Sequence, residues 1–143
     1  MLFRSTLDAG FEAAAVALGE LLPDTRLVVG GRSAGARSAC RTASGLGAVG
    51  CLALAFPLHP PGRPERSRIE ELLGSGVPTL VVQGERDTFG RPEEFPSLPA
   101  THRLVALPGA DHSLKVGARA VPDQAAVLER AVLAVEGFVA SLL

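Results

Sequence analysis

The chain has 143 residues, of which 47% are hydrophobic and 20% charged, and its formal net charge is −1. This length and composition are typical of a single globular domain and exclude a disordered chain. The 14 basic and 15 acidic residues form no basic run that would bind nucleic acid or an anionic membrane. Trp and Tyr are absent, so stacking of bases on aromatic rings is also disfavoured. We therefore expect residues 1–143 to form one domain that binds neither nucleic acid nor a membrane.

The predicted secondary structure alternates helices with strands. Helices are predicted from Leu7 to Leu21 (capped by Ser5 or Thr6), over 33–43, over 65–73, and from Pro122 or Asp123 onward with Val127, Leu128 and Ala131 facing inward. Buried strands are predicted over 26–30, 48–55, 78–82 and 103–107. Strands that are apolar throughout indicate a parallel sheet covered on both faces, and the alternation indicates right-handed crossover units. The predicted fold class is α/β, with about four parallel strands flanked by helices.

The cysteines and the apolar runs indicate a soluble protein of a reducing compartment. Cys40 and Cys51 lie in apolar stretches, which is typical of buried, reduced thiols. The longest apolar run, Leu46 to Leu58, is interrupted by Pro57 and is too short to span a bilayer. We expect a cytoplasmic protein. The two cysteines and three histidines match no metal-ligand spacing, so we expect neither a metal ion nor a cofactor.

One glycine-rich segment, Leu27 to Arg37, follows a predicted strand and precedes a predicted helix, and three interpretations compete for it. A dinucleotide fingerprint would need glycine where Arg32 stands, three positions into the pattern. A phosphate-binding loop would need lysine where Ala36 stands. The third interpretation fits, because Gly31-Arg32-Ser33-Ala34-Gly35 has the GxSxG pattern of a nucleophile elbow.

A nucleophile elbow is a tight turn that exposes a serine hydroxyl between a strand and a helix. We expect side chains at Gly31 or Gly35 to collide with the adjacent strand or helix, which would explain both glycines. The hydroxyl of Ser33 would then stand at a helix N-terminus. There the N–H of Ala34 can stabilise a developing oxyanion.

A nucleophilic serine needs a base, and the base needs an acid that orients it. Asp87 lies in a turn after the third predicted strand, and His112 lies in a turn after the fourth. The carboxyl ends of parallel strands meet at one edge of a sheet, where open α/β sheets place their sites. We therefore predict a triad of Ser33, Asp87 and His112. The alternative is that these are ordinary loop residues in a domain that has lost catalysis.

Other polar residues have simpler interpretations. We expect His59 to have a structural or rim role, His102 to be a solvated residue at a strand edge, and Asp111 to shape its turn. Arg32 could contact an anionic substrate, although pairing with a nearby carboxylate is the simpler expectation. The Glu-rich helix of residues 65–71 is predicted to present a solvated face.

Four motifs in order, GGRSAGAR, AFPLHPPGRPERSR, VPTLVVQGERDTFG and GADHSLK, resemble a group of predicted α/β-hydrolases. This group is similar to dienelactone hydrolases, and its animal members include a subunit of the NSL histone acetyltransferase complex. The resemblance extends from about residue 5 to the C-terminus. It implies that Ser33 is the nucleophile, Asp87 the acid and His112 the base. The implied activity is hydrolysis of a small ester or thioester through an acyl-enzyme.

The sequence departs from this group in one respect. In the α/β-hydrolase fold the elbow follows the fifth of eight strands, whereas here a single predicted helix and strand precede Ser33. The resemblance therefore implies the C-terminal part of that fold, without the loop that donates the second oxyanion N–H. It also implies an open, apolar edge at the strand 26–30, so we expect either that residues 1–143 are an N-terminally truncated domain or that a second copy of the chain covers this edge. An inactive interaction module with this fold is the alternative function.

Overall fold

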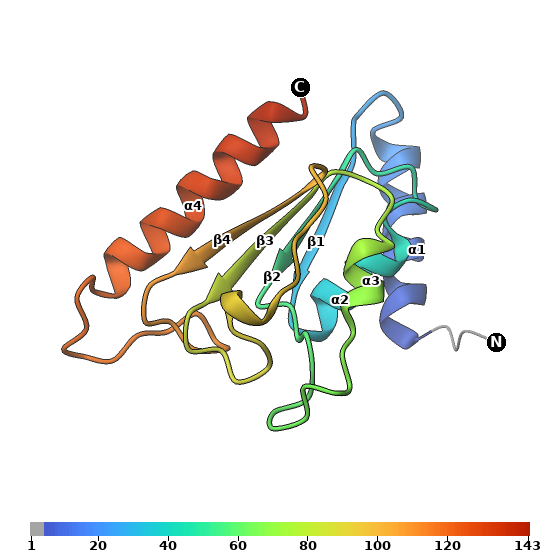
Figure 1. Ribbon diagram of the computed structural model, residues 1–143. Helices are drawn as coiled ribbons and strands as arrows, with labels where there is room; N and C mark the ends of the chain where they lie inside the picture. Colours follow the sequence, from blue (N-terminus) through green and yellow to red (C-terminus); the bar gives the residue numbers. More distant parts are fainter. Residues whose placement is uncertain (1–4) are drawn as a thin grey trace.

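The computed structural model describes residues 5–143. Its centre is a sheet of four parallel strands in the spatial order β1-β2-β3-β4. The strands are β1 (Val28–Arg32), β2 (Gly50–Leu54), β3 (Thr79–Gly84) and β4 (His102–Leu107). The predicted α/β class and four parallel strands are confirmed. All four carboxyl ends lie at the same edge of the sheet, as Figure 1 shows.

The first strand was predicted over 26–30, but β1 begins and ends two residues later. Gly30 and Gly31 are part of the strand and do not end it. Gly30 pairs with Leu52 and Arg32 pairs with Leu54. A Cβ atom on Gly30 would lie 2.8 Å from the Cβ of Leu52, so only glycine fits between these two strands. The pairing brings the backbone to the carboxyl edge of the sheet, where the N–H of Ser33 donates to the carbonyl of Leu54 at 3.0 Å.

Helices cover both faces of the sheet (Figure 1). One face is covered by α2 (Ala34–Thr42), against which α1 (Thr6–Leu21) and α3 (Ile69–Leu73) pack. The other face is covered by α4 (Gln124–Ser141), which packs on β3 and β4. A short 3-10 turn, η1 (Pro92–Glu94), lies in the connection from β3 to β4. The sheet is therefore the middle layer of three.

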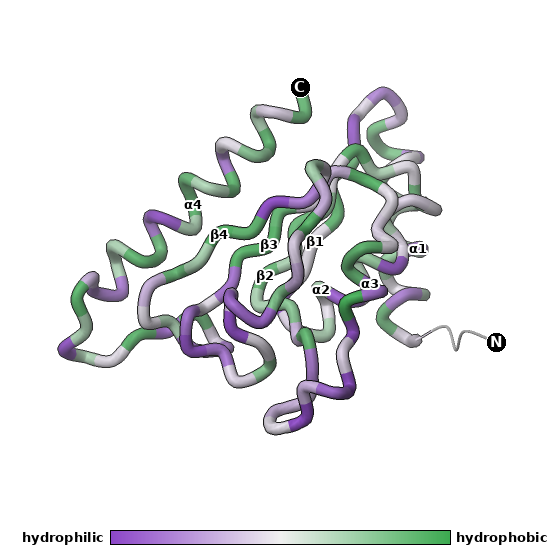
Figure 2. Tube along the Cα trace, viewed as in Figure 1, coloured by the Kyte–Doolittle hydropathy of each residue, from purple (hydrophilic) through white to green (hydrophobic). Residues whose placement is uncertain are grey.

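Alternating side chains of the strands form two separate cores, one on each face. Cys51, Ala53 and Val81 pack with α2 on one face, and Leu80 and Val82 pack with α4 on the other. Successive residues of a strand point to opposite faces, so strands with both faces covered must be apolar throughout. Figure 2 shows hydrophobic residues along the strands and hydrophilic ones gathered in the loop between β2 and α3.

The two long helices, α1 and α4, begin at predicted N-cap residues. The hydroxyl of Ser5 accepts from the N–H of Asp8 at the start of α1, and Asp123 caps α4 in the same way through Ala126. One inward assignment on α4 is wrong: Val127 is fully buried, but Leu128 is 46% exposed. Leu128 is one position round the helix from the narrow stripe that faces the sheet.

Two further predictions concern the thiols and the membrane. Cys40 and Cys51 are free and buried, as predicted, with their sulfur atoms 3.9 Å apart in the core between α2 and β2. Contact with the Cys51 thiol, together with burial, raises the pKa of Cys40 far above its usual range. Among residues 5–143, no helix combines the length and the apolar character that crossing a bilayer requires.

Candidate active site

The segment around Ser33 is a strained turn between β1 and α2. Ser33 has φ 55° and ψ −119°, a backbone conformation that residues with a side chain rarely adopt. A Cβ atom on Gly31 would lie 2.5 Å from the carbonyl carbon of Gly35, so the turn closes only because Gly31 has no side chain. This strained turn between a strand and a helix is the conformation expected of a nucleophile elbow.

The second glycine of the pattern has a different role from the predicted one. A Cβ atom on Gly35 would meet no atom within 4 Å, so the expected collision at Gly35 is wrong. The backbone of Gly35 fills the space that a side chain on Gly31 would need, whereas a side chain on Gly35 would extend into open space. Gly31 alone is therefore sterically required by the turn.

The loops after β3 and β4 bring the other two predicted residues to Ser33. Asp87 follows β3 and His112 follows β4, as predicted. The two loops meet at Gly84, where a Cβ atom would clash with the carbonyl oxygens of Ala110 and Asp111. The absence of a side chain at Gly84 lets the loop carrying His112 lie directly over the end of β3.

Ser33, His112 and Asp87 form one chain of hydrogen bonds. The Ser33 Oγ and the His112 Nε2 are 2.8 Å apart. The His112 Nδ1 is 3.0 Å from Oδ1 and 2.9 Å from Oδ2 of Asp87. The Asp87 side chain is fully buried and that of His112 is 20% exposed. A hydroxyl, an imidazole and a buried carboxylate in this order can transfer a proton from the hydroxyl to the ring.

Phe89 also supports this arrangement, and no sequence pattern had singled it out. Its ring stacks on the imidazole of His112, with centroids 4.2 Å apart and an interplanar angle of 28°. Its backbone N–H donates to the Oδ1 of Asp87 at 2.8 Å. One residue therefore contacts both partners of the hydrogen-bonded pair.

The predicted oxyanion donor lies at the start of α2. Ala34 is the first residue of the helix and directly follows Ser33. The carbonyl of Ser33 accepts from the N–H groups of Ala36 and Arg37, so the first turn of α2 begins at the serine itself. The partial positive charge of a helix N-terminus is therefore next to the Ser33 hydroxyl.

His59 has a structural role, as expected. Its backbone N–H donates to the carbonyl of Phe89, and its Nδ1 donates to the carbonyl of Pro60 at 2.8 Å. Its Nε2 lies 2.9 Å from a carboxylate oxygen of Glu94. The carbonyl of Pro60, aided by Glu94, raises the pKa of His59 despite burial and the nearby charge of Arg68. The ring thereby ties the loop after β2 to the loop that carries Phe89.

His102 is buried rather than solvated. Its side chain reaches the end of α3, where its Nε2 donates to the carbonyl of Leu72 at 2.9 Å. The prediction of a solvated edge residue is wrong because β4 begins beneath the last turn of α3. Asp111 has the predicted role of shaping its turn. Its Oδ1 accepts from the N–H groups of Ser113 and Lys115, in the loop that follows β4.

The predictions for the charged residues Arg32, Glu70 and Glu71 had different outcomes. Arg32 is exposed, and within residues 5–143 no carboxylate is found paired with it, so the expected pairing is not observed. On the third helix, Glu70 is exposed as predicted. The prediction is wrong for Glu71, which forms ion pairs with Arg37 at 2.7 Å and Arg41 at 3.0 Å. Burial opposes ionisation there, but the two guanidinium groups lower the pKa of Glu71.

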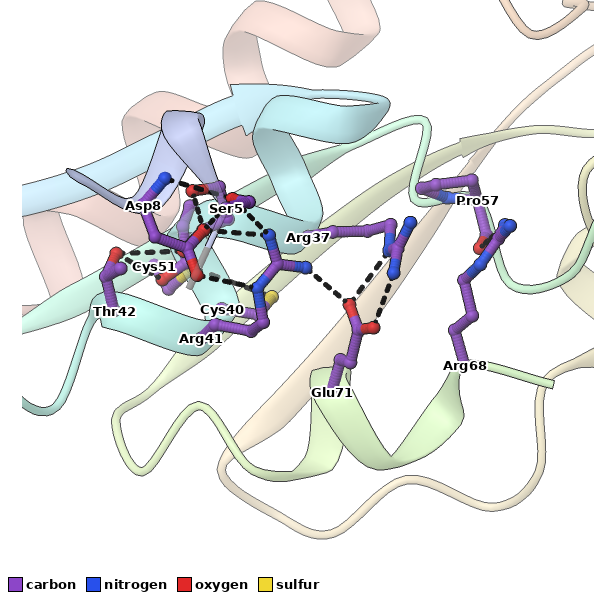
Figure 3. Close-up of polar contacts among 12 residues, drawn as sticks. Ser5, Asp8, Arg37, Cys40, Arg41, Thr42, Cys51, Pro57, Arg68 and Glu71 are labelled. Carbon is purple, nitrogen blue, oxygen red and sulfur yellow. Dashed lines mark hydrogen bonds and ion pairs between the residues drawn. The ribbon is translucent and has the colours of Figure 1, made fainter. Parts of the chain in front are cut away.

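Glu71 belongs to a polar network that joins α1, α2 and α3 (Figure 3). Asp8 of α1 is buried, and its carboxylate accepts from the guanidinium of Arg41 at 2.8 and 3.0 Å and from the hydroxyl of Ser38. The hydrogen bond from Arg41, followed by those from Ser38 and Ser5, holds the pKa of Asp8 well below its usual range. The network fixes α2, the helix that begins at Ser33.

Two of the cavities at the surface bear on the site. An apolar groove of about 460 Å³ between α1 and β1 contains none of Ser33, Asp87 and His112. A cleft of about 390 Å³ has Asp87, Thr88 and His59 among its lining residues, but neither Ser33 nor His112. The described residues hold no group of three or more His, Cys, Asp or Glu side chains arranged for a metal ion.

A parallel sheet with an elbow serine, a histidine and a carboxylate at its carboxyl edge is the architecture of the α/β hydrolases. The chain matches the alpha/beta hydrolase domain family over residues 5–140 and belongs to it. A search of curated proteins finds no match.

Solved structures share the fold at low sequence identity. An alpha-beta serine hydrolase homologue from Coxiella burnetii has a TM-score of 0.64 at 17% identity, over 89% of this chain and 56% of that one. The esterase domain of a Rhodothermus marinus protein has a TM-score of 0.62 at 17% identity, over 95% and 69%. An α/β serine hydrolase without a lid from Xanthomonas campestris has a TM-score of 0.58 at 21% identity, over 86% and 54%. The chain thus spans little more than half the length of the first and third of these proteins.

Proposed function

We propose that this chain is a serine hydrolase that cleaves carboxylic esters or thioesters. The observation that carries the proposal is the hydrogen-bonded chain from the Ser33 hydroxyl through His112 to the buried carboxylate of Asp87. The strained backbone of Ser33 supports it, because strain of this kind is maintained where it serves a site. A retained but inactive interaction module would need neither these two hydrogen bonds nor the strained backbone of Ser33.

In the proposed reaction, the Ser33 Oγ attacks the acyl carbon while the Nε2 of His112 accepts the hydroxyl proton. Asp87 holds the imidazole in the tautomer that carries its proton on Nδ1 and stabilises the imidazolium that forms. The N–H of Ala34 donates to the oxyanion. His112 then protonates the leaving alcohol or thiol, which leaves an acyl group on Ser33. Water, deprotonated by His112, hydrolyses that acyl-enzyme and restores the hydroxyl.

The proposed substrate is a small acyl ester or thioester, and the proposed compartment is the cytoplasm. The two free, buried thiols support a reducing compartment.

The direct test is covalent labelling of the purified protein with a fluorophosphonate, read out by intact mass. We expect one adduct on the wild type and none on Ser33→Ala. Ser113→Ala is the matched control, because Ser113 is an exposed serine beside His112 and should not affect labelling. Absence of an adduct on folded wild-type protein would contradict the proposal and favour the interaction module.

Hydrolysis of a short acyl ester provides a second measurement, which also tests the acid. We expect Asp87→Asn to lower kcat by about 10⁴-fold, as replacement of a triad acid does elsewhere. Asp111→Asn is the control, because the Asp111 carboxylate accepts only from backbone N–H groups of its own turn. A larger loss in Asp111→Asn than in Asp87→Asn would show that the acid is misassigned.

A further inference from the structure

Gln83 is a fully buried polar residue near the carboxyl end of β3, directly after the apolar residues Leu80, Val81 and Val82. Its Oε1 accepts from the backbone N–H of Phe56 at 2.9 Å. Its Nε2 lies 3.1 Å from the carbonyl of Phe56, 2.7 Å from the carbonyl of Gly90 and 3.1 Å from the Oδ2 of Asp87. The amide therefore joins the loop after β2, the loop after β3 and the carboxylate of the proposed triad.

The surroundings of the amide permit only one orientation. The N–H of Phe56 can only donate, so it must face Oε1, and the carbonyls of Phe56 and Gly90 can only accept, so they must face Nε2. A flipped amide would place its oxygen against three acceptors. The amide nitrogen of Gln83, with two N–H groups for three acceptors, is consequently the atom that faces the Oδ2 of Asp87.

Each oxygen of Asp87 has its own donor in addition to His112. Oδ1 accepts from the backbone N–H of Phe89 at 2.8 Å, and Oδ2 accepts from Gln83. These two bonds set the plane of the carboxylate, with both oxygens 2.9–3.0 Å from the Nδ1 of His112. Without the bond from Gln83, the carboxylate could rotate about the bond to its Cβ, and the direction in which it holds the imidazole would be less restricted.

We propose that Gln83 is a positioning residue that orients the Asp87 carboxylate toward His112. The inference rests on the proposed hydrolase function and adds a residue to it. An apolar side chain at this position would leave backbone groups of Phe56 and Gly90 without their partner as well as Asp87. The amide therefore holds the two loops together and, through the same nitrogen, the carboxylate of Asp87.

The test is the rate of fluorophosphonate labelling of Ser33 in Gln83→Met, a variant of similar length that cannot donate. We expect a fall of about 10-fold in the second-order rate constant, which corresponds to about 1.4 kcal/mol of activation free energy. With an ester substrate, kcat should fall while KM changes less than twofold, because Gln83 is fully buried and cannot contact the substrate. An unchanged labelling rate in folded Gln83→Met would overturn the proposal.

A control separates positioning from general loss of stability. Thr79→Val removes a buried hydroxyl of the same strand, one that bonds Ser75 and the carbonyl of Val77 at the end far from the site. We expect this variant to lower the melting temperature while its labelling rate stays at the wild-type value. A parallel loss of labelling in Thr79→Val would show that the rate follows the stability of β3, and that Gln83 has no specific role.

A double-mutant cycle tests whether Gln83 acts through Asp87. In an Asp87→Asn background the carboxylate is absent, so Gln83→Met should lower the residual labelling rate less than twofold. Independent, multiplying effects of the two changes would overturn the proposal.

Gln83→Asn, which keeps an amide but is one methylene shorter, should show the same fall in labelling rate as Gln83→Met. If neither Gln83→Met nor Gln83→Asn folds, Gln83 has a role in the core alone, and this result would also overturn the proposal.

The outcomes distinguish this inference from the proposed function. If wild-type protein is not labelled at Ser33, the hydrolase proposal fails before Gln83 is considered. If wild type is labelled and Asp87→Asn is slow, but Gln83→Met labels at the wild-type rate, only the inference on Gln83 fails.

Discussion

At the scale of single residues, the turn around Ser33 depends on what its neighbours lack. The two glycines of the GxSxG pattern look equivalent in the sequence, yet only Gly31 is pressed against other backbone atoms. The serine itself carries the strain of the turn through its positive φ. The difference between the two glycines can be measured.

We expect Gly31→Ala to destabilise the protein and to abolish labelling of Ser33. The added methyl group would overlap the backbone of Gly35, and overpacking of this kind costs about 2 kcal/mol of unfolding free energy. Gly35→Ala is the matched control. Its methyl group meets open space within α2, so the free energy of unfolding should stay the same or rise by up to about 1 kcal/mol. Urea denaturation measures both, and equal losses in the two variants would contradict this account.

At the scale of elements, the position of α2 decides where Ser33 lies, and the polar network of Asp8, Arg41, Arg37 and Glu71 holds α2 to its neighbours. Asp8 is the only one of these residues contributed by α1. The network is therefore the polar part of the contact between α1 and α2, beside the apolar packing of Phe11.

We expect Asp8→Asn to lower the free energy of unfolding by about 2 kcal/mol at neutral pH, because it leaves the partly buried guanidinium of Arg41 without its closest carboxylate. Asp24→Asn, in the exposed turn after α1, should change it little. Since the folded-state pKa of Asp8 is lowered, its contribution is fully present above its ordinary value of 3.8 and is lost as the pH falls. The difference between wild type and Asp8→Asn should therefore shrink on acidification, and a constant difference would contradict it.

At the scale of the whole molecule, β1 and β4 are the two edge strands of the sheet formed by residues 5–143. The outer side of β1 has no strand partner within residues 5–143, and the apolar groove between α1 and β1 runs along it. Unpaired strand edges with apolar side chains favour association with another strand. Exposed apolar residues of α1, among them Val16 and Leu21, extend this surface.

Self-association through the edge of β1 stays a prediction from the sequence. Sedimentation velocity across a range of protein concentrations tests it, with a dimer as the expected species. Val28→Lys places a charge on the edge strand and should shift the population toward the monomer, since charged residues on edge strands oppose pairing. A monomer at every concentration, or a dimer that Val28→Lys leaves unchanged, would contradict association through this edge.

The sequence by itself determined the class and the order of the fold. Runs such as Leu80–Val82 are apolar on both sides, which indicates a strand covered on two faces, and this predicted the parallel sheet. The order of the elbow serine, the acid and the histidine along these strands predicted which three residues meet, because parallel strands bring their carboxyl ends to one edge. Both are local patterns combined with a general rule of topology.

Only the tertiary structure decided the contacts that depend on which loops and helices lie against each other. The burial of His102 beneath α3 and the pairing of Glu71 with two arginines could not be predicted, because these partners are distant in sequence. Gln83 and Phe89 are only four and two residues from Asp87, but their hydrogen bonds to its carboxylate depend on the conformation of the loop after β3, which no sequence pattern specified. Hydrogen bonds and close packing act over a few ångströms in space, and a sequence pattern registers only positions along the chain.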